Sequence, residues 1–356
     1  MEKQLIPQLR FSEFKDNWVC KKLKDISKVY DGTHQTPKYV KKGIPFYSVE
    51  HLTSNQFNKT KFISEKVFEK ENKRVKLEKG DVLMTRIGSI GVSKYIDWDV
   101  NASFYVSLAL LKKKSVYDSK YLNQLIKSDY FQKELWKRTI HVAFPKKINL
   151  GEIGECYIVL PSLAEQNKLA AFLTNIDELI TGLSKKKKLL EQYKKGVMQK
   201  IFNQELRFKD DNDKKYSNWS ERKLGDISNI TTGSSNRQDS GLDGEFTFFD
   251  RSEDIRTSNR YLFDGEAVIV AGEGSDFKPK YYKGKFDLHQ RTYAIMDFTG
   301  QEGKYIFYYI HHHRRYFLSQ AVGSTVKSLR LPMFQKMPIP LPQKEEQKKI
   351  ASFLSD

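Results

Sequence analysis

The sequence PSLAEQNKLAAFLT at residues 161–174 returns, with changes, as PQKEEQKKIASFLS at residues 342–355. Seven of the 14 positions are identical, at a constant offset of 181 residues. Self-similarity at a fixed offset is typical of repeated structural units. The repeat therefore predicts a chain with two related halves.

A second repeated block lies upstream of the first. Residues 17–27, NWVCKKLKDIS, return as NWSERKLGDIS at residues 218–228, with seven identities in eleven positions. The offset here is 201 residues, so the two halves share their start and finish while the middles differ in length and sequence. We expect the middles to share one fold, because weaker similarity surrounds Gly80-Asp81 and Gly265-Glu266.

A periodic apolar pattern follows Pro161. Its positions are spaced alternately by three and four residues, which is the a/d seam of a coiled coil. The pattern predicts a helix from about Glu165 to Phe202, roughly 57 Å long at 1.5 Å per residue. One helix cannot bury its own stripe, so the seam needs a partner. The apolar seam residues are Leu169, Phe172, Ile176, Leu179, Leu183, Leu190, Tyr193 and Val197.

Composition narrows the class of protein. The chain has 356 residues, enough for two domains, with a formal net charge of +18 and a sequence pI near 9.5. This charge favours a polyanionic partner, either nucleic acid or an anionic membrane surface. Cys20 and Cys156 lack paired metal-type spacing and indicate no disulfide framework. There is no signal-peptide core in Met1–Phe11 and no long uncharged apolar run, so we expect a cytoplasmic protein.

Local patterns indicate a mixed fold. Short apolar runs bounded by turn residues predict strands, and helical apolar spacing predicts helices, so each half belongs to the α+β class. The expected strands are 82–84, 105–111, 157–160 and 268–271, and the expected helices are 119–137 and 304–317.

A basic chain with this repeated frame, its variable middles and its long helix resembles the specificity subunits of type I restriction-modification enzymes. The resemblance covers nearly the whole chain and is carried by residues 18–27 and 219–228, by Gly80-Asp81-Val82-Leu83, and above all by 161–172 and 342–353. None of these motifs is catalytic.

The resemblance implies a division of labour along the chain. Residues 1–160 and 209–341 would be target-recognition domains, each reading one half of a split DNA sequence. Residues 161–208 would form the central conserved helix, and residues 342–356 would begin a distal helix that is largely missing. In that family the helices form an antiparallel coiled coil that docks methyltransferase subunits, and motor-nuclease subunits join the complex.

Candidate DNA contacts are loops that carry donors and acceptors suited to base edges, together with lysine and arginine for phosphates. A plain solvated loop is the competing interpretation for each of them. In the first half the candidates are Thr33, His34, Gln35, Arg86, Ser89, His141, Lys146 and Lys147. In the second half they are Ser234, Ser235, Asn236, Arg237, Gln238, Lys278, Lys280, Lys327 and Arg330.

Nothing in the sequence predicts catalysis, a metal or a cofactor. His311, His312 and His313 are consecutive, so on a helix they point in different directions and cannot converge on one ion. The glycine-rich stretches at 88–91 and 272–274 lack the lysine and hydroxyl residue of a phosphate loop. The alternatives left open are a basic coiled-coil scaffold or membrane-surface protein without sequence readout, and an independent nuclease.

Overall fold

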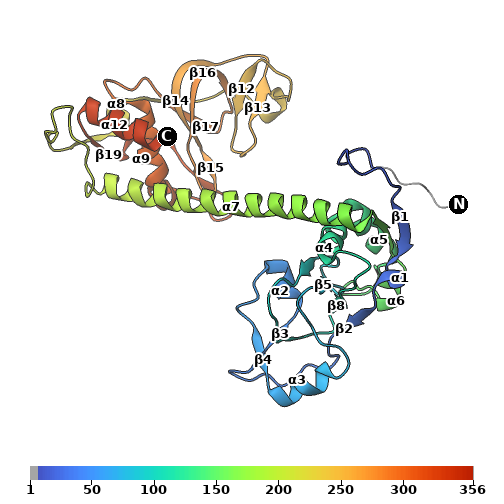
Figure 1. Ribbon diagram of the computed structural model, residues 1–356. Helices are drawn as coiled ribbons and strands as arrows, with labels where there is room; N and C mark the ends of the chain where they lie inside the picture. The colour runs from blue at the N-terminus through green and yellow to red at the C-terminus, as the bar shows by residue number, and fades with distance from the viewer. Residues whose placement is uncertain (1–6, 356) are drawn as a thin grey trace. The chain divides into compact units, whose positions relative to one another are not determined.

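The computed structural model describes residues 7–355 (Figure 1). The chain forms two compact units, Met1–Leu183 and Ser184–Asp356, and the boundary falls within helix α7, Leu163–Phe202. This 40-residue helix confirms the long helix expected from the apolar spacing. The domain limits expected from the sequence include residues 1–6 and 356, which lie outside the described part.

Unit 1 is a mixed α and β unit. Its sheets have the strand orders β2-β8-β5-β6 and β4-β3-β7, and a separate pair joins β1 to β9. The elements are β1 (Val19–Lys22), α1 (Leu23–Ile26), β2 (Val29–Asp31), β3 (Ile44–Tyr47), α2 (Val49–Ser54), β4 (Lys61–Ile63), α3 (Glu65–Asn72), β5 (Val82–Thr85), β6 (Ser93–Tyr95), β7 (Ser103–Phe104), β8 (Leu108–Leu111), α4 (Ser119–Lys127), α5 (Asp129–Arg138), α6 (Leu150–Gly154) and β9 (Tyr157–Leu160).

Unit 2 has one larger sheet, with the order β11-β17-β14-β16-β12-β13, and the pairs β10-β19 and β15-β18. Its elements are β10 (Ser220–Lys223), α8 (Leu224–Ile227), β11 (Asn229–Thr232), a short 3-10 helix (Arg237–Asp239), β12 (Phe246–Phe249), β13 (Arg256–Ser258), β14 (Phe263–Ala271), β15 (Glu273–Gly274), β16 (Lys280–Leu288), β17 (Thr292–Met296), α9 (Gly303–His312), α10 (Arg315–Gln320), β18 (Lys327–Ser328), α11 (Leu331–Gln335), β19 (Pro338–Leu341) and α12 (Lys344–Ser355).

The two middles share one topology, as expected. In both units the strand after the first short helix pairs with the last strand of the sheet, β2 with β8 and β11 with β17. In both units, another strand pairs in parallel with the strand that comes just before the last one along the chain: β3 pairs with β7, and β12 pairs with β16. Unit 2 runs through this region as one continuous strand, β16, where unit 1 has β6, a loop and β7. The sheet of unit 1 is therefore interrupted, whereas that of unit 2 is not.

The Glu-Gln pair at residues 165–166 recurs at 346–347, and its contacts explain why the two repeated sequence blocks, the frame of each unit, occur in both halves of the chain. The buried Glu165 carboxylate accepts two bonds from Arg10, from Nε at 2.8 Å and Nη2 at 2.7 Å, and one from the Trp18 indole N–H at 3.2 Å. In unit 2, the buried Glu346 binds Arg207 and Trp219 in the same way, at 3.1, 2.7 and 3.1 Å. A buried carboxylate needs such partners to offset its desolvation.

The glutamine of the pair joins the block to a helix start. The Gln166 amide donates to the Pro161 carbonyl at 2.9 Å, and its Oε1 accepts from the N–H of Asp118, which caps α4. Gln347 does the same with Pro342 and with Glu302, which caps α9. An otherwise unpaired N–H at a helix start is thereby satisfied in each unit.

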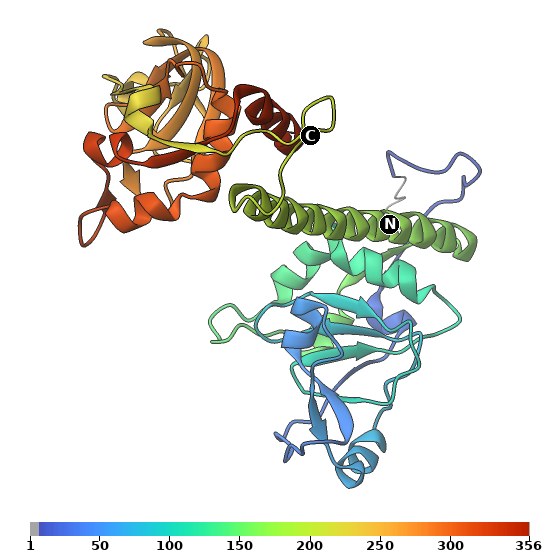
Figure 2. The same cartoon turned by 90° about the vertical axis from the view of Figure 1, so that its left-hand side faces the viewer.

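Two expected helices are each broken in two. Residues 119–137 form α4 and α5, because Ser128 adopts an extended backbone and its hydroxyl caps Phe131 N–H at 3.4 Å. Residues 304–317 similarly divide into α9 and α10. The expected strand 105–111 is also corrected, since only Leu108–Leu111 is strand within it. Figure 2 shows α4 between the sheet of unit 1 and the start of α7, where Gln124 and Lys127 contact Asp177.

Within residues 7–355, no helix combines the length and the apolar character that crossing a membrane requires.

Candidate nucleic-acid interface

Each unit has a glycine that lets a loop cross the end of the sheet. A Cβ placed on Gly32, just after β2, would lie 1.9 Å from the carbonyl oxygen of Phe104. A Cβ on Gly233, just after β11, would lie 1.7 Å from that of Leu288. Both distances are far below van der Waals contact, so only glycine fits. The next residues, 33–35 and 234–236, therefore begin at equivalent places in the two units.

In unit 1, backbone hydrogen bonds hold four loops together at this end of the sheet. Val106 N–H donates to Thr33 O at 2.9 Å, and Arg86 N–H donates to Ser107 O at 2.9 Å. Gly88 N–H donates to Lys146 O at 2.8 Å, and Ile87 pairs with Lys147. The three sequence regions chosen in this half, around residues 33–35, 86–89 and 141–147, therefore share one face.

Two of the candidate side chains on this face are not free to read DNA. Arg86 is only 8% exposed, and its guanidinium donates to Ile148 O at 3.1 Å and to Val106 O at 2.7 Å. Burial lowers the pKa of Arg86. Thr33 is also buried and bonds within its own turn, to Gln35 O. Both side chains therefore stabilise the loops of the face and are not exposed on its surface.

The remaining candidates of unit 1 are exposed: His34, Gln35, Ser89, His141, Lys146 and Lys147. His34 Nε2 lies 2.9 Å from the buried Asp31 carboxylate, which also holds Arg74 at 2.7 Å. The His141 ring packs on Trp136, with ring centroids 4.1 Å apart. The face thus carries donors and positive charge around one fixed carboxylate.

Unit 2 assembles the corresponding loops by the same bonds. Gln290 N–H donates to Ser235 O at 3.0 Å, and Gly272 N–H donates to Arg291 O at 2.8 Å. Strand β15 pairs with β18, which joins Glu273 to Ser328 and Gly274 to Lys327. Leu329 N–H then donates to Gly272 O, as Ile148 N–H does to Arg86 O in unit 1. The loops 234–238, 289–291, 272–274 and 327–330 therefore form the equivalent face.

Acidic groups orient the arginines of this face. Arg237 lies 3.2 Å from the buried Asp250, and Arg291 lies 2.8 Å from Glu273, which also faces Arg251 at 3.6 Å. The pKa of Asp250 is lowered, because hydrogen bonds from Ser252 and the charges of Arg237 and Lys280 outweigh burial. The arginines of these pairs are exposed and the acids are largely covered, so the acids restrict where the guanidinium groups lie.

The candidates of unit 2 divide in the same way. Ser235 is fully buried and its hydroxyl donates to Asp287 at 2.5 Å, so it supports the loop from below. Lys280 is half-buried, with Nζ donating to Ser252 O at 2.6 Å, and burial lowers its pKa. Lys278 is exposed, and no hydrogen bond or ion pair among the described residues joins it to the face. The nearby Asp276 pairs with Arg314, which directly precedes α10. The exposed or half-exposed candidates on the face are Ser234, Asn236, Arg237, Gln238, Lys327 and Arg330.

Several residues of this face escaped the sequence analysis. Gln290 donates to the Asn236 side chain at 2.7 Å, and Arg251, Arg260 and Arg291 are exposed beside the candidates. The available signal is the polar run His289-Gln290-Arg291 directly after strand β16, whose last three residues are buried. The offset of 181 also extends farther upstream than the repeated block, since it pairs Lys146 with Lys327 and Leu150 with Leu331.

The apolar seam of α7 is exposed over most of its length. Phe172, Leu179, Leu183, Leu190 and Tyr193 are each more than half exposed. Leu169, Ile176 and Val197 are partly covered, and Met198, Ile201 and Phe202 are buried in the core of unit 2. The two ends of the helix therefore pack into the cores of different units, and its middle presents an apolar stripe that the described residues leave largely exposed.

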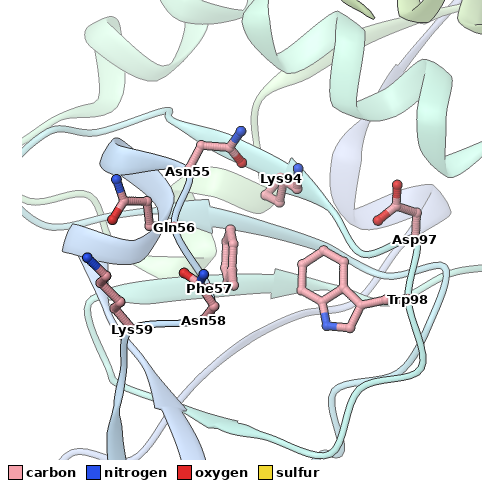
Figure 3. A pocket seen from close by; sticks show the side chains of 8 residues that line it. All are labelled: Asn55, Gln56, Phe57, Asn58, Lys59, Lys94, Asp97 and Trp98. Carbon is pink, nitrogen blue, oxygen red and sulfur yellow. The ribbon is translucent and has the colours of Figure 1, made fainter. Parts of the chain in front are cut away.

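Two hollows lie apart from these faces. One of about 670 Å³ is lined by residues 55–59, Lys94, Asp97 and Trp98 (Figure 3), at the end of the β5–β6 hairpin opposite the turn at Gly88. The other, in unit 2, lies between the end of α7 and α9–α10 and includes His311, His312 and His313. Burial lowers the pKa of all three histidines. Among residues 7–355, no group of histidine, cysteine or acidic side chains is arranged to hold a metal ion.

Comparison with known proteins gives one consistent family. A family model described as the type I restriction modification DNA specificity domain matches residues 15–192 and 216–356. The putative type I restriction enzyme MjaX specificity subunit of Methanocaldococcus jannaschii is 25% identical over 96% of this chain and 87% of its own length. The type I restriction enzyme EcoDI specificity subunit of Escherichia coli is 30% identical, over 38% of this chain and 30% of its own.

The fold is also found among solved structures. The type-I restriction-modification system S subunit from M. genitalium superposes with a TM-score of 0.69 at 14% sequence identity, covering 99% of this chain and 92% of that one. At this identity the likeness concerns the fold, including two mixed units and the long helix.

Proposed function

The chain belongs to the type I restriction modification DNA specificity family, and we propose that it selects the DNA sequence on which a type I complex acts. Each unit would read one half of a bipartite target through the face formed by its loops at the end of the sheet, described above. We retain the division into recognition domains 1–160 and 209–341, a central helix 161–208 and a distal helix beginning at 342 as part of this proposal.

One observation carries the proposal: two equivalent faces, built by matching backbone bonds, present different side chains. Unit 1 has His34 and Gln35 after the bonded Thr33, whereas unit 2 has Asn236 and Arg237 after the bonded Ser235. A lysine is kept at 146 and 327. Reading two different half-sites requires this combination of a common frame and variable donors and acceptors. A basic scaffold without readout would give no reason for the variation, and that alternative is not favoured.

The chemistry of the faces suits duplex DNA. Asparagine and glutamine can bond adenine edges, arginine can bond guanine, and lysines can neutralise phosphates. In unit 2 the acids at 250 and 273 hold Arg237 and Arg291 in place before DNA arrives, which reduces the entropy lost on binding. The net charge of +18 supports association with a polyanion.

We further propose that the exposed seam of α7 docks methyltransferase subunits and that motor-nuclease subunits join the resulting complex. The chain itself would supply recognition and no catalytic group or cofactor. Between Phe172 and Tyr193 the seam is mostly apolar and largely exposed, with Ile176 partly covered and a lysine at position 186. This is the kind of surface that an obligate helical partner covers.

The proposal is tested by selecting binding sequences from a random duplex library with the chain bound to its methyltransferase subunit. Two conserved blocks separated by a spacer of fixed length are expected. Replacing Asn236 and Arg237 with alanine should reduce the sequence preference within one block and leave the other block unchanged. The affected block is thereby assigned to unit 2. A single block that responds equally to changes in both units would contradict division of the target between them.

A further inference from the structure

One loop of the unit 1 face carries apolar side chains where only polar contacts were expected. Residues 141–146 form a loop whose ends are paired, because Ile140 N–H donates to Lys147 O at 2.8 Å. At its tip, Phe144 is 103% exposed and Val142 is 96% exposed. A fully exposed phenylalanine ring is unfavourable to hydrate, and contact with a partner would remove it from water.

We propose that Phe144 is a recognition residue that makes direct apolar contact with the bases of the half-site read by unit 1. The proposal rests on the proposed function and adds an apolar element to a surface otherwise made of donors and charges. An exposed aromatic ring can insert between base steps, and it can pack against a thymine methyl group. Both contacts exclude water from the ring.

The position of the loop favours DNA as the partner. Its C-terminal end is joined to the Gly88 loop, since Gly88 N–H donates to Lys146 O and Ile87 pairs with Lys147. The Gly88 loop is in turn joined through Arg86 and residues 106–107 to the loop at Thr33. Phe144 thus belongs to the same face as the exposed His34 and Gln35.

Charge around the tip also favours DNA over an apolar protein groove. His141, Lys146 and Lys147 flank the two apolar residues and are all exposed. Lys146 Nζ lies 4.9 Å above the ring of Trp136, and His141 packs on the same ring. Trp136 therefore holds both ends of the loop, so the tip is positioned before binding and the lysines can neutralise phosphates beside it.

Unit 2 has the same loop with a different tip. Val322 pairs with Ser328, as Ile140 does with Lys147, and the residues between them are 323–327. The lysine next to the closing pair is kept, Lys146 in one unit and Lys327 in the other. Counted from that lysine, Thr325 takes the place of Phe144, and Val326 beside it is about half exposed. A constant cation with a variable tip matches a phosphate contact beside a base contact.

The test compares Phe144→Ala with the wild-type chain, each bound to the methyltransferase subunit, in the selection from random duplexes. We expect the block assigned to unit 1 to broaden at one or two positions, and affinity for the wild-type target to fall about tenfold. The block assigned to unit 2 should not change. Val116→Ala is the matched control, because Val116 is also exposed but follows β8 at the other end of the sheet.

Thermal melting separates recognition from folding. Because the Phe144 side chain is fully exposed, the variant should have the same melting temperature as the wild-type protein. If the selected sequence blocks and the DNA affinity of the variant are unchanged, the proposal is overturned. It is also overturned if the blocks stay intact but the variant binds the methyltransferase subunit more weakly, because the loop would then be a protein-docking element. If the wild-type complex selects no blocks at all, the proposed function itself fails, an outcome distinct from failure of Phe144 alone.

Discussion

At the scale of single residues, the buried carboxylate of each frame is the most informative side chain. Replacing Glu346 with glutamine keeps the size of the side chain but removes the charge that binds Arg207 and the Trp219 N–H. We expect unit 2 to lose about 2 kcal/mol of unfolding free energy, as for a buried hydrogen bond to a charged group. Denaturant titration of the unit 2 transition measures this loss.

The chain offers a matched control one residue away. Glu345 is exposed at the start of α12, so Glu345→Gln makes the same chemical change without disturbing a buried pair. Its unfolding free energy should stay within about 0.5 kcal/mol of wild type, the usual range for surface substitutions. Equal effects of the two substitutions would contradict the role given to the repeated glutamate.

A second residue-scale prediction concerns acid. Burial, with the charges of His313 and His311, lowers the pKa of His312 to about 4. The unfolded chain therefore binds a proton at this site at a higher pH than the folded one does, and stability is retained above pH 6.5 but lost as the pH falls toward 4. Thermal melting at pH 7.5 and 5.0 should show this loss, and His312→Gln should reduce it.

The control for this prediction is Gln192→Asn, an exposed residue of α7 that carries no titrating group. It should leave the pH dependence of melting unchanged. A wild-type chain that melts at one temperature across this range would show that His312 is not kept neutral by folding.

Residue types were predictable from sequence more readily than residue exposure. Arg86, Thr33 and Ser235 have the chemistry of DNA-reading residues and lie in the right loops, yet each bonds inward. Sequence pattern places a residue in a loop, but the direction of its side chain depends on partners far along the chain, such as Ile148 for Arg86 and Asp287 for Ser235. Phe144 was overlooked because aromatic residues are usually core.

At the scale of elements, α7 is the best test of assembly. Leu183 and Leu190 are 64% and 55% exposed, so changing them to aspartate should leave the units folded. The charges would be buried against any partner that covers the seam, which is costly without a counter-charge. We expect Leu183→Asp with Leu190→Asp to abolish co-purification with methyltransferase subunits, while Gln192→Asp, an exposed residue off the seam, leaves it intact. Co-purification of the double variant would exclude the seam as the docking surface.

The long helix and the strand at 157–160 followed directly from the sequence pattern, whereas the helix breaks did not. Ser128 ends α4 and caps α5 with one hydroxyl, and a single serine within a strong helical pattern gives little warning of this. A third repeat was also overlooked, Leu9-Arg10-Phe11 and Leu206-Arg207-Phe208. Its offset differs from those of both blocks, although its arginines bind the repeated glutamates.

At the scale of the whole molecule, phosphate contacts should dominate the affinity. Each neutralised phosphate releases counterions, so the logarithm of the binding constant falls with the logarithm of salt by about 0.9 per contact. Lys146→Ala and Lys327→Ala should each reduce this slope by about one, while Lys344→Ala on α12 should not change it. Fluorescence anisotropy across a salt series measures the slopes, and a flat wild-type response would exclude phosphate binding.

The architecture as a whole was the most predictable part. Two repeated frames, one long helix and variable middles sufficed to predict two units of one fold, because buried frame contacts constrain sequence strongly. The interruption between β6 and β7, and the assembly of each face from four separated loops, depend on tertiary pairing that no local pattern encodes.

The most direct measurement of the central claim is the pattern of base methylation in cells that express this chain with its cognate methyltransferase subunit. The account predicts one bipartite motif, with two specified blocks separated by a spacer of constant length. No motif, while the same methyltransferase methylates DNA with another specificity subunit, would contradict the claim that this chain selects the target.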